Sequence, residues 1–144
     1  MTTLEEQIDV TLPVGRTWEQ LHRVADYPRF VAGLRHAAAH GRNRARLDVE
    51  IGGVRRSFVA ELTDRGRGRV MTWQTVDGVH LKGTFALRPL DATHTQVQLR
   101  LEYDPETLRD DLGGDGPVGF AQSHTIEEAV RADLALFKEL VEHR

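Results

Sequence analysis

One arginine of this sequence falls where an apolar side chain is expected. The segments 44–51 and 54–63 alternate between apolar and polar residues around a Gly-Gly pair, which is typical of two strands joined by a two-residue turn. This alternation places Phe58 on the inner face of its strand, and Arg56 falls on the same face. A guanidinium in apolar surroundings must be matched by an anion or an acceptor. Its N–H groups could hold a ketone or enolate oxygen of a ligand and stabilise the negative charge that develops there.

Asp133 is the candidate partner of Arg56. At ~100° per residue, Asp133 lies within the helical stripe of Ile126, Val130 and Phe137 and not opposite to it. An inward aspartate facing an inward arginine suggests a pair across the interior. In a catalytic role Asp133 would position Arg56 or act as a base toward an acidic carbon. The competing interpretation is structural, with an ion pair, a helix-end contact, or an arginine that passes the sheet edge to reach solvent.

A second group of candidates consists of side chains expected on inner faces or at the mouth of an internal cavity. They would line the cavity and stack on a flat ligand, although aromatic residues on an inner face are usually ordinary core. Tyr27 falls in a short helical segment, where its hydroxyl could reach a ligand or serve packing alone. The candidate ligand-binding residues are Tyr27, Phe30, Phe58, Trp73, Leu81, Phe85, Tyr103, Ser123 and Val130.

The direction of Trp73 depends on the register of a hairpin with Asp-Gly at its turn. A two-residue loop would pair Val76 with Val79 and mix apolar and polar side chains on both faces. A three-residue loop, with Gly78 in the left-handed region, would pair Thr75 with Val79. We prefer this second register because a strand buries one face, and it gathers Met71, Trp73, Val79, Leu81, Gly83, Phe85 and Leu87 on the same side.

Other motifs favour no site. His36 and His40 have i,i+4 spacing but no third ligand, so we expect no metal. The RGRGR stretch at 65–69 favours a solvated loop over a nucleic-acid site, because it lacks interleaved aromatics and the chain carries a net charge of −3. The GGDG stretch at 113–116 lacks the strand and helix of a dinucleotide site.

The composition indicates a soluble protein. The chain has 144 residues and no cysteine, which excludes disulfides and thiol chemistry. No apolar run approaches the ~18 residues of a membrane span. The first ten residues are acidic and lack a signal-peptide core, so we expect a cytoplasmic location.

The pattern of elements predicts an α+β fold. An antiparallel sheet with one apolar face needs a cover, and the final helix is the only element long enough to provide it. We expect about seven strands to curve around this helix and to leave an internal hydrophobic cavity, closed at one end by two short helices after the first strand. The expected strands are 4–12, 35–40, 44–51, 54–63, 70–76, 79–89 and 94–103, with a short helix after 104 and the long helix after 117.

Six stretches occur in an order that is found in a known family. They are PVGRTWEQLHRVADYPRF, EIGGVRRSFVAELTD, VMTWQTVDG, GTFALRPL, THTQVQLRLEYDP and DLALFKELVEHR, and they span nearly the whole chain. Their combination resembles the polyketide cyclase/dehydrase family of the START-like (SRPBCC) superfamily. The resemblance implies one helix-grip domain over residues 1–144 with a hydrophobic cavity. Aromatase/cyclases that resemble this chain place an arginine in that cavity, and Arg56 is the position that we match to it.

Two functions are compatible with this resemblance. The first is an aromatase/cyclase-type enzyme that needs no cofactor, because aldol condensation is redox-neutral and positioning supplies up to ~7–11 kcal/mol in ideal cases. The second is a non-catalytic carrier or sensor of a lipid or quinone. For both functions the expected partner is a hydrophobic or aromatic small molecule, which is polyketide-like for the enzyme. We expect no nucleic-acid partner and no membrane span. The sequence is also compatible with a homodimer.

Overall fold

A computed structural model describes residues 2–51, 54–64, 69–76, 80–104 and 123–143, and these form one curved sheet with helices on one side. The elements in chain order are β1 (Thr2–Val10), α1 (Val14–Leu21), the 3₁₀ helix η1 (Val24–Arg29), β2 (Leu34–Ala39), β3 (Arg44–Ile51), β4 (Val54–Asp64), β5 (Val70–Thr75), β6 (Leu81–Pro89), β7 (Thr95–Tyr103) and α3 (Ser123–Glu142). The expected α+β architecture is confirmed.

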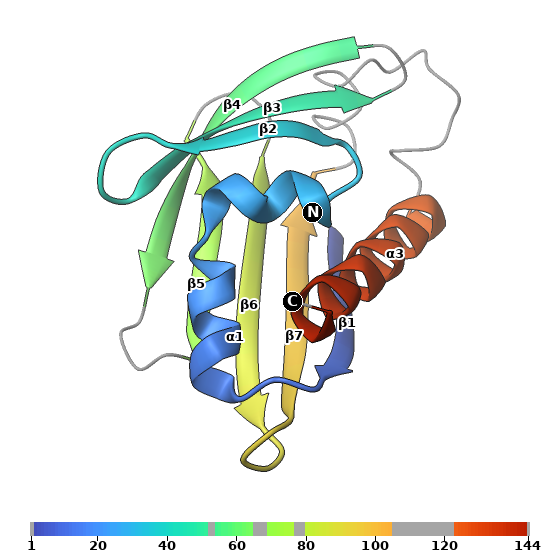
Figure 1. Cartoon of the computed structure of the whole chain (residues 1–144). Helices are drawn as coiled ribbons and strands as arrows, with labels where there is room; N and C mark the ends of the chain where they lie inside the picture. The colour runs from blue at the N-terminus through green and yellow to red at the C-terminus, as the bar shows by residue number, and fades with distance from the viewer. Residues whose placement is uncertain (1, 52–53, 65–68, 77–79, 105–122, 144) are drawn as a thin grey trace.

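The seven strands form an antiparallel sheet in the order β1-β7-β6-β5-β4-β3-β2. The chain leaves β1 through α1 and η1, reaches the opposite edge at β2, and returns strand by strand to pair β7 with β1. In Figure 1, α3 runs along the β1 edge while α1 lies over the middle of the sheet. The inner face of the sheet is therefore covered from two sides by separate helices.

The alternation read from the sequence describes the β3–β4 hairpin correctly. Glu50 lies opposite Arg55 and Arg44 lies opposite Glu61, in the register that a two-residue turn gives. The corresponding ion pairs measure 3.0 Å from Arg55 Nε to Glu50 Oε2 and 3.3 Å from Arg44 Nη2 to Glu61 Oε2. The opposite faces of these strands carry Phe58 and other buried apolar residues. Charge pairs on the outer face and apolar contacts on the inner face thus agree on one register.

The β5–β6 hairpin confirms the predicted faces but not the predicted pairing. Trp73 lies opposite Gly83, and Thr75 meets Leu81, whose backbone N–H donates to Thr75 Oγ1 at 3.2 Å. Thr75 therefore does not pair with Val79, and the turn residues 77–79 lie outside the described part of the chain. The observed register differs by two residues, which leaves every side chain on its predicted face.

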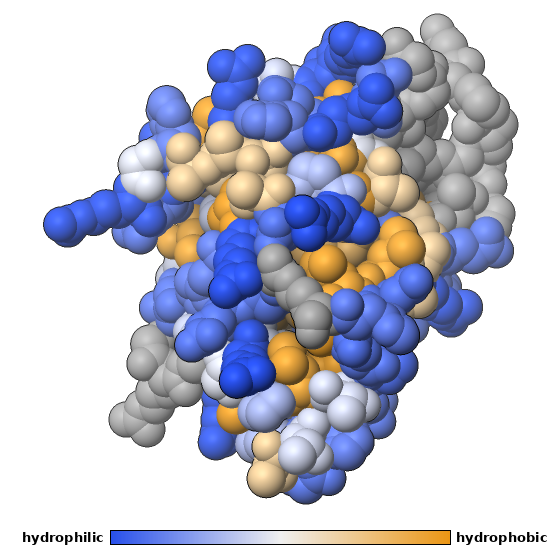
Figure 2. All heavy atoms as spheres, in the orientation of Figure 1, coloured by the Kyte–Doolittle hydropathy of each residue, from blue (hydrophilic) through white to orange (hydrophobic). Residues whose placement is uncertain are grey.

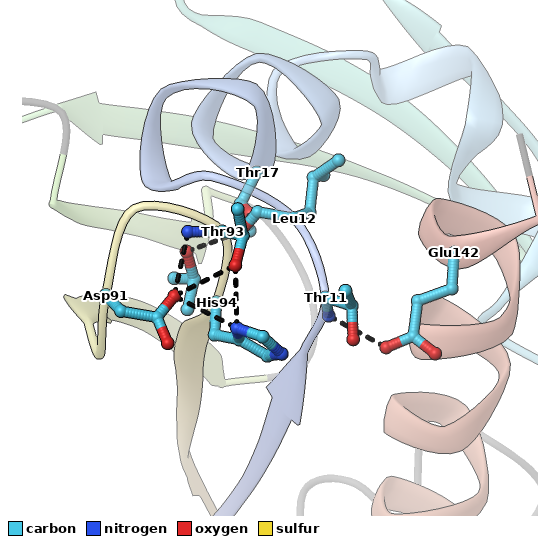
Figure 3. Close-up of polar contacts among 8 residues, drawn as sticks. Thr11, Leu12, Thr17, Asp91, Thr93, His94 and Glu142 are labelled. Atoms are coloured by element: carbon cyan, nitrogen blue, oxygen red, sulfur yellow. Dashed lines mark hydrogen bonds and ion pairs between the residues drawn. The ribbon is translucent and has the colours of Figure 1, made fainter.

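The first strand ends two residues earlier than predicted, at Val10, which pairs with Thr95 at the start of β7, and beyond this point the Leu12 carbonyl is bonded to side chains. Thr95 Oγ1 donates to this carbonyl at 2.7 Å, and Thr17 Oγ1, in the first turn of α1, lies 3.5 Å from it. Figure 3 shows Leu12 and Thr17 at this corner. The two short helices expected after the first strand are α1, which ends at Leu21, and η1, which begins at Val24. The helix predicted after 104 and the residues from 117 to 122 lie outside the described ranges.

Polar contacts fix α3 along the β1 edge. Arg131 Nε donates to Glu6 Oε1 at 3.0 Å, and Lys138 Nζ donates to the Asp9 carbonyl at 2.8 Å. At the C-terminal end of the helix, Glu142 accepts the Thr11 N–H at 2.8 Å, as Figure 3 shows. The apolar stripe of α3 faces the sheet and is buried, with Ile126, Val130, Leu134, Phe137 and Val141.

Candidate functional site

A row of four aromatic rings connects the sheet to α3 through η1. Trp73 on β5 meets Tyr27 edge-on at 6.1 Å between ring centroids, and Tyr27 lies 5.2 Å from Phe30. Phe30 then meets Phe137 of α3 at 5.0 Å, again edge-on. Such tilted and T-shaped contacts are the favoured geometries for aromatic pairs. The row forms an apolar wall between the sheet and the helix.

The Tyr27 hydroxyl stabilises this wall. It donates to the Leu21 carbonyl at 2.5 Å and accepts the Trp73 Nε1–H at 3.0 Å. Burial raises the pKa of Tyr27 above its ordinary value, and the Trp73 hydrogen bond opposes this only in part. We expected the hydroxyl to reach a ligand or serve packing, and the structure shows it bonded to protein groups on both sides.

Beside this wall, apolar residues on the inner face of central strands remain partly exposed. They are Trp73, Leu81, Phe85, Leu99 and Leu101. Central strands beneath helices normally bury such residues, so exposed apolar area at this position indicates incomplete cover. In the orientation of Figure 1, Figure 2 shows apolar side chains at the surface between the α1–η1 segment and α3.

Gly83 shows that there is room above this apolar floor. A Cβ added at Gly83 would meet only the Cδ1 atoms of Leu101 at 3.8 Å and Leu99 at 3.9 Å, which are ordinary van der Waals distances. Trp73 lies opposite Gly83 on the neighbouring strand, but no atom of its ring comes within 4 Å of this added Cβ. The indole turns instead toward Tyr27. A flat apolar molecule could therefore rest on the floor formed by β6 and β7.

The remaining ligand-binding candidates lie deeper. Phe58 is 9 % exposed, Phe30 3 %, Val130 7 % and Tyr103 0 %. All four belong to the apolar core that joins the sheet, η1 and α3. Ser123 is the first residue of α3, and its side chain lies outside the described part of the structure.

Arg56 has an exposed side chain, which corrects the expectation of a buried guanidinium. Arg56 lies opposite Val49, on the same face of β4 as Phe58, so its predicted face is right. It sits close to the β3–β4 turn, however, where the side chain reaches solvent. Its Nη1 donates to the Arg55 carbonyl at 3.0 Å. Because the guanidinium is exposed and donates to a backbone carbonyl, it carries no large desolvation cost.

Arg56 lines a polar pocket of about 380 Å³ over β2, β3 and β4. The two carboxylates of the pocket are paired, Glu50 with Arg35 and Arg55, and Asp48 with Arg46. Ser57 donates to Asp48 at 2.6 Å, and chiefly this hydrogen bond lowers the pKa of Asp48. The lining residues are Arg35, His36, Arg46, Asp48, Val49, Glu50, Arg55, Arg56 and Ser57. This pocket is charged and open, unlike the apolar floor.

Asp133 lies where α3 approaches the connection between η1 and β2. Its Oδ1 accepts the Ala32 N–H at 3.2 Å, and the side chain is half-buried beside Val130 and Phe137 of the inner stripe. Burial raises the pKa of Asp133 from 3.8 to about 6, and the Ala32 hydrogen bond opposes this shift. A carboxylate with such a pKa is suited to exchange protons near neutral pH.

Among the residues that the structure describes, no hydrogen bond or ion pair joins Asp133 to Arg56, which corrects the pair that we expected across the interior. Asp133 contacts Ala32, and Arg56 lies over the far half of the sheet, on β4. Leu99 and Leu101, the floor residues around Gly83, were not among the candidates from the sequence. Nothing in the sequence indicated that the helices leave them partly uncovered.

Histidines pair with single carboxylates in this fold. His22 Nε2 lies 3.1 Å from Asp64 and His36 Nδ1 lies 3.6 Å from Asp48. Within the described ranges, no three His, Cys, Asp or Glu side chains are placed to hold a metal ion. No helix in the same ranges has the length and apolar character needed to cross a membrane.

Comparison with known proteins identifies similar sequences and folds. The model of the family described as polyketide cyclase/dehydrase and lipid transport matches residues 1–142. An uncharacterized 17.2 kDa protein from the melC2-rnhH intergenic region of Streptomyces lincolnensis is 27 % identical over 145 residues, covering 100 % of this chain and 92 % of that protein.

Two solved structures share the fold at low sequence identity. The Zhui aromatase/cyclase from Streptomyces sp. R1128 has a TM-score of 0.74 at 19 % identity, covering 99 % of this chain and 94 % of that one. A START superfamily protein from Mycobacterium smegmatis has a TM-score of 0.75 at 17 % identity, covering 98 % and 97 %. The curved sheet with its C-terminal helix is thus the START-like, helix-grip arrangement.

Proposed function

Because the chain belongs to the polyketide cyclase/dehydrase and lipid transport family, we propose that it binds a flat hydrophobic molecule on the inner face of the sheet and promotes its aldol cyclisation and dehydration. The observation that carries the binding proposal is the partly exposed apolar floor beside the aromatic wall. A ligand resting on Leu99 and Leu101 would remove apolar surface from water, which is favourable at ~25 cal/mol per Å². The aromatic wall would limit the orientations available to a flat ring.

Asp133 supplies the strongest argument for chemistry in addition to binding. With a pKa of about 6, it is largely ionised at neutral pH yet readily protonated. As a base it would remove a proton from a carbon between two ketones, and the resulting enolate carbon would attack a second carbonyl of the same chain. The alkoxide formed would take up a proton, and loss of water would give the unsaturated ring. Each step is redox-neutral.

A second candidate function is a carrier or sensor of a lipid or quinone. Two observations favour it. The Tyr27 hydroxyl and the Asp133 carboxylate are both already bonded to backbone groups, and the Arg56 guanidinium is exposed. A carrier needs the apolar floor alone, whereas cyclisation needs groups that move protons.

A binding and product assay separates the two functions. We would titrate the protein with fatty acids, quinones and aromatic polyketides and follow Trp73 fluorescence in a Trp18→Phe background, then analyse each mixture by chromatography and mass spectrometry. The cyclase proposal expects saturable binding and a dehydrated product that disappears in Asp133→Asn while binding remains. Arg56→Ala tests the oxygen-binding role suggested by the sequence.

The outcomes of this assay are distinct. Saturable binding with every ligand recovered unchanged would favour the carrier. Product formation that survives Asp133→Asn would remove Asp133 from the mechanism. Loss of product in Arg56→Ala, with binding intact, would restore Arg56 as a catalytic group. No binding by any flat or long apolar ligand would contradict the binding proposal itself.

A further inference from the structure

Within the part of the chain that the structure describes, the Tyr103 hydroxyl is a buried donor without an acceptor. Tyr103 is the last residue of β7, and its side chain is 0 % exposed. Among the residues that the structure describes, its oxygen has no hydrogen-bond partner. Most buried side-chain hydroxyls are hydrogen-bonded, because one left unpaired loses its bonds to water and gains nothing. A phenylalanine would fill the same space without this cost.

The neighbours of Tyr103 in the sheet place it beside the apolar floor. Tyr103 lies between Thr2 of β1 and Leu81 of β6, and the strand backbones are paired with one another. The next inner-face residue along β7 is Leu101. Two of these neighbours, Leu81 and Leu101, belong to the partly exposed apolar floor. Tyr103 is therefore a direct neighbour, within the sheet, of residues on which the proposed ligand would rest.

The other interior tyrosine behaves differently. The Tyr27 hydroxyl donates to the Leu21 carbonyl and accepts from the Trp73 indole, so both of its hydrogen-bonding capacities are used. Tyr27 thus stabilises the fold through its hydroxyl, whereas the Tyr103 hydroxyl makes no hydrogen bond within the described part of the protein. Tyr27→Phe is therefore a matched control for Tyr103→Phe.

We propose that the Tyr103 hydroxyl donates a hydrogen bond to an oxygen of the bound molecule, and that the ligands are accordingly flat apolar compounds carrying a ketone or phenol oxygen. This proposal rests on the proposed binding function and narrows it to one ligand class. An oxygen placed beyond Leu81 and Leu101 would accept the Tyr103 O–H after a small movement of these side chains. A ring hydrocarbon would cover the same floor but would leave the hydroxyl unpaired.

Ligands that differ by one oxygen test this proposal. Fluorenone and fluorene have the same ring skeleton, and only fluorenone carries a carbonyl. We expect the wild-type protein to bind fluorenone about tenfold more tightly than fluorene, as one neutral hydrogen bond allows. In Tyr103→Phe the two affinities should agree within about twofold, with the fluorene affinity unchanged.

Two further measurements distinguish a loss of the ligand hydrogen bond from a folding defect of the variant. Without ligand, Tyr103→Phe should melt at or above the wild-type temperature, whereas Tyr27→Phe should melt lower because it loses two hydrogen bonds. The carbonyl stretching frequency of fluorenone bound to wild type should fall below its value in an apolar solvent. This infrared measurement does not depend on any variant.

The outcomes distinguish this inference from the binding function. Binding of both ligands with equal affinity in wild type, or a fluorenone preference that survives Tyr103→Phe, would overturn the role of Tyr103 while leaving the apolar site intact. An unshifted carbonyl frequency would overturn it as well. Failure of both ligands to bind wild type would contradict the proposed function and the inference together.

Discussion

Replacing Asp133 by asparagine should stabilise the protein at neutral and alkaline pH and have little effect in acid. The substitution removes the charge but keeps a side-chain oxygen that can accept the Ala32 N–H, now 3.2 Å from Asp133 Oδ1. In the native protein, burial raises the pKa of Asp133 from 3.8 to about 6. The folded state therefore binds the proton more tightly than the unfolded chain does.

The sign and size of the effect follow from this difference in pKa. A carboxyl whose pKa is raised on folding contributes stability below its unfolded pKa of 3.8, and this is lost as the pH rises through about 6. Each pKa unit corresponds to ~1.4 kcal/mol. Because the side chain is only half-buried, solvent screening reduces the free energy that corresponds to this pKa shift. We therefore expect about 1 kcal/mol in the free energy of unfolding. Asp133→Asn should thus exceed wild type by about 1 kcal/mol at pH 8 and match it near pH 4.

Denaturant unfolding of both proteins between pH 4 and pH 8 measures this difference. Asp91→Asn serves as a control of opposite sign, because the Thr93 N–H first, and then His94, lower the pKa of Asp91 to about 2 (Figure 3). The control should be less stable than wild type across this range. A stability difference for Asp133→Asn that is independent of pH, or that grows in acid, would refute the assignment of a raised pKa to this group.

Two other substitutions test the wall and the floor. Gly83→Val should weaken fluorenone binding at least tenfold, because the added side chain would occupy the space above the floor. The melting temperature should stay unchanged or rise, because a Cβ there meets only Leu101 at 3.8 Å and Leu99 at 3.9 Å and valine is favoured in strands. Ala86→Val, on the opposite face of β6, is the control. An equal loss of fluorenone affinity in the two variants would argue against a ligand above Gly83. Phe30→Ala should cost ~3–5 kcal/mol in denaturant unfolding because it opens a cavity between Tyr27 and Phe137, and Phe30→Leu should cost less than ~1.5 kcal/mol. A cost below ~1 kcal/mol for Phe30→Ala would mean that the aromatic row does not support the fold.

The faces of the strands could be predicted from the sequence more reliably than their pairing. Alternation determined that Trp73 and Phe85 point inward, and the structure confirms it. The pairing of Thr75 was wrong, because a shift of two residues conserves every face and leaves the hydrophobic pattern unchanged. The geometry of the turn decides between such registers, and the Asp-Gly pair alone allowed more than one.

The candidate site was harder to predict because it depends on how far the helices extend over the inner face of the sheet. Periodicity correctly placed Arg56 on the inner face of β4, but it gives no information on whether the helices reach that far along the strand. The position of Asp133 on α3 was also right, whereas its partner is the Ala32 N–H. This contact could not be predicted from the sequence, because a backbone N–H is present whichever residue occupies position 32, proline excepted.

The pairing of β1 with β7 has a consequence for how the protein folds. Thr2 lies opposite Tyr103 and Val10 lies opposite Thr95, so this ladder joins residues 85 to 101 positions apart in the sequence. Hairpins such as β3–β4 and β5–β6 close short loops, but β1 remains without its neighbour until β7 has been synthesised. Contacts of such separation slow folding, because the entropy of loop closure is lost before they form. By this argument β1 joins the sheet last, after β7 has paired with β6, and mutations in β1 should act mainly on the unfolding rate.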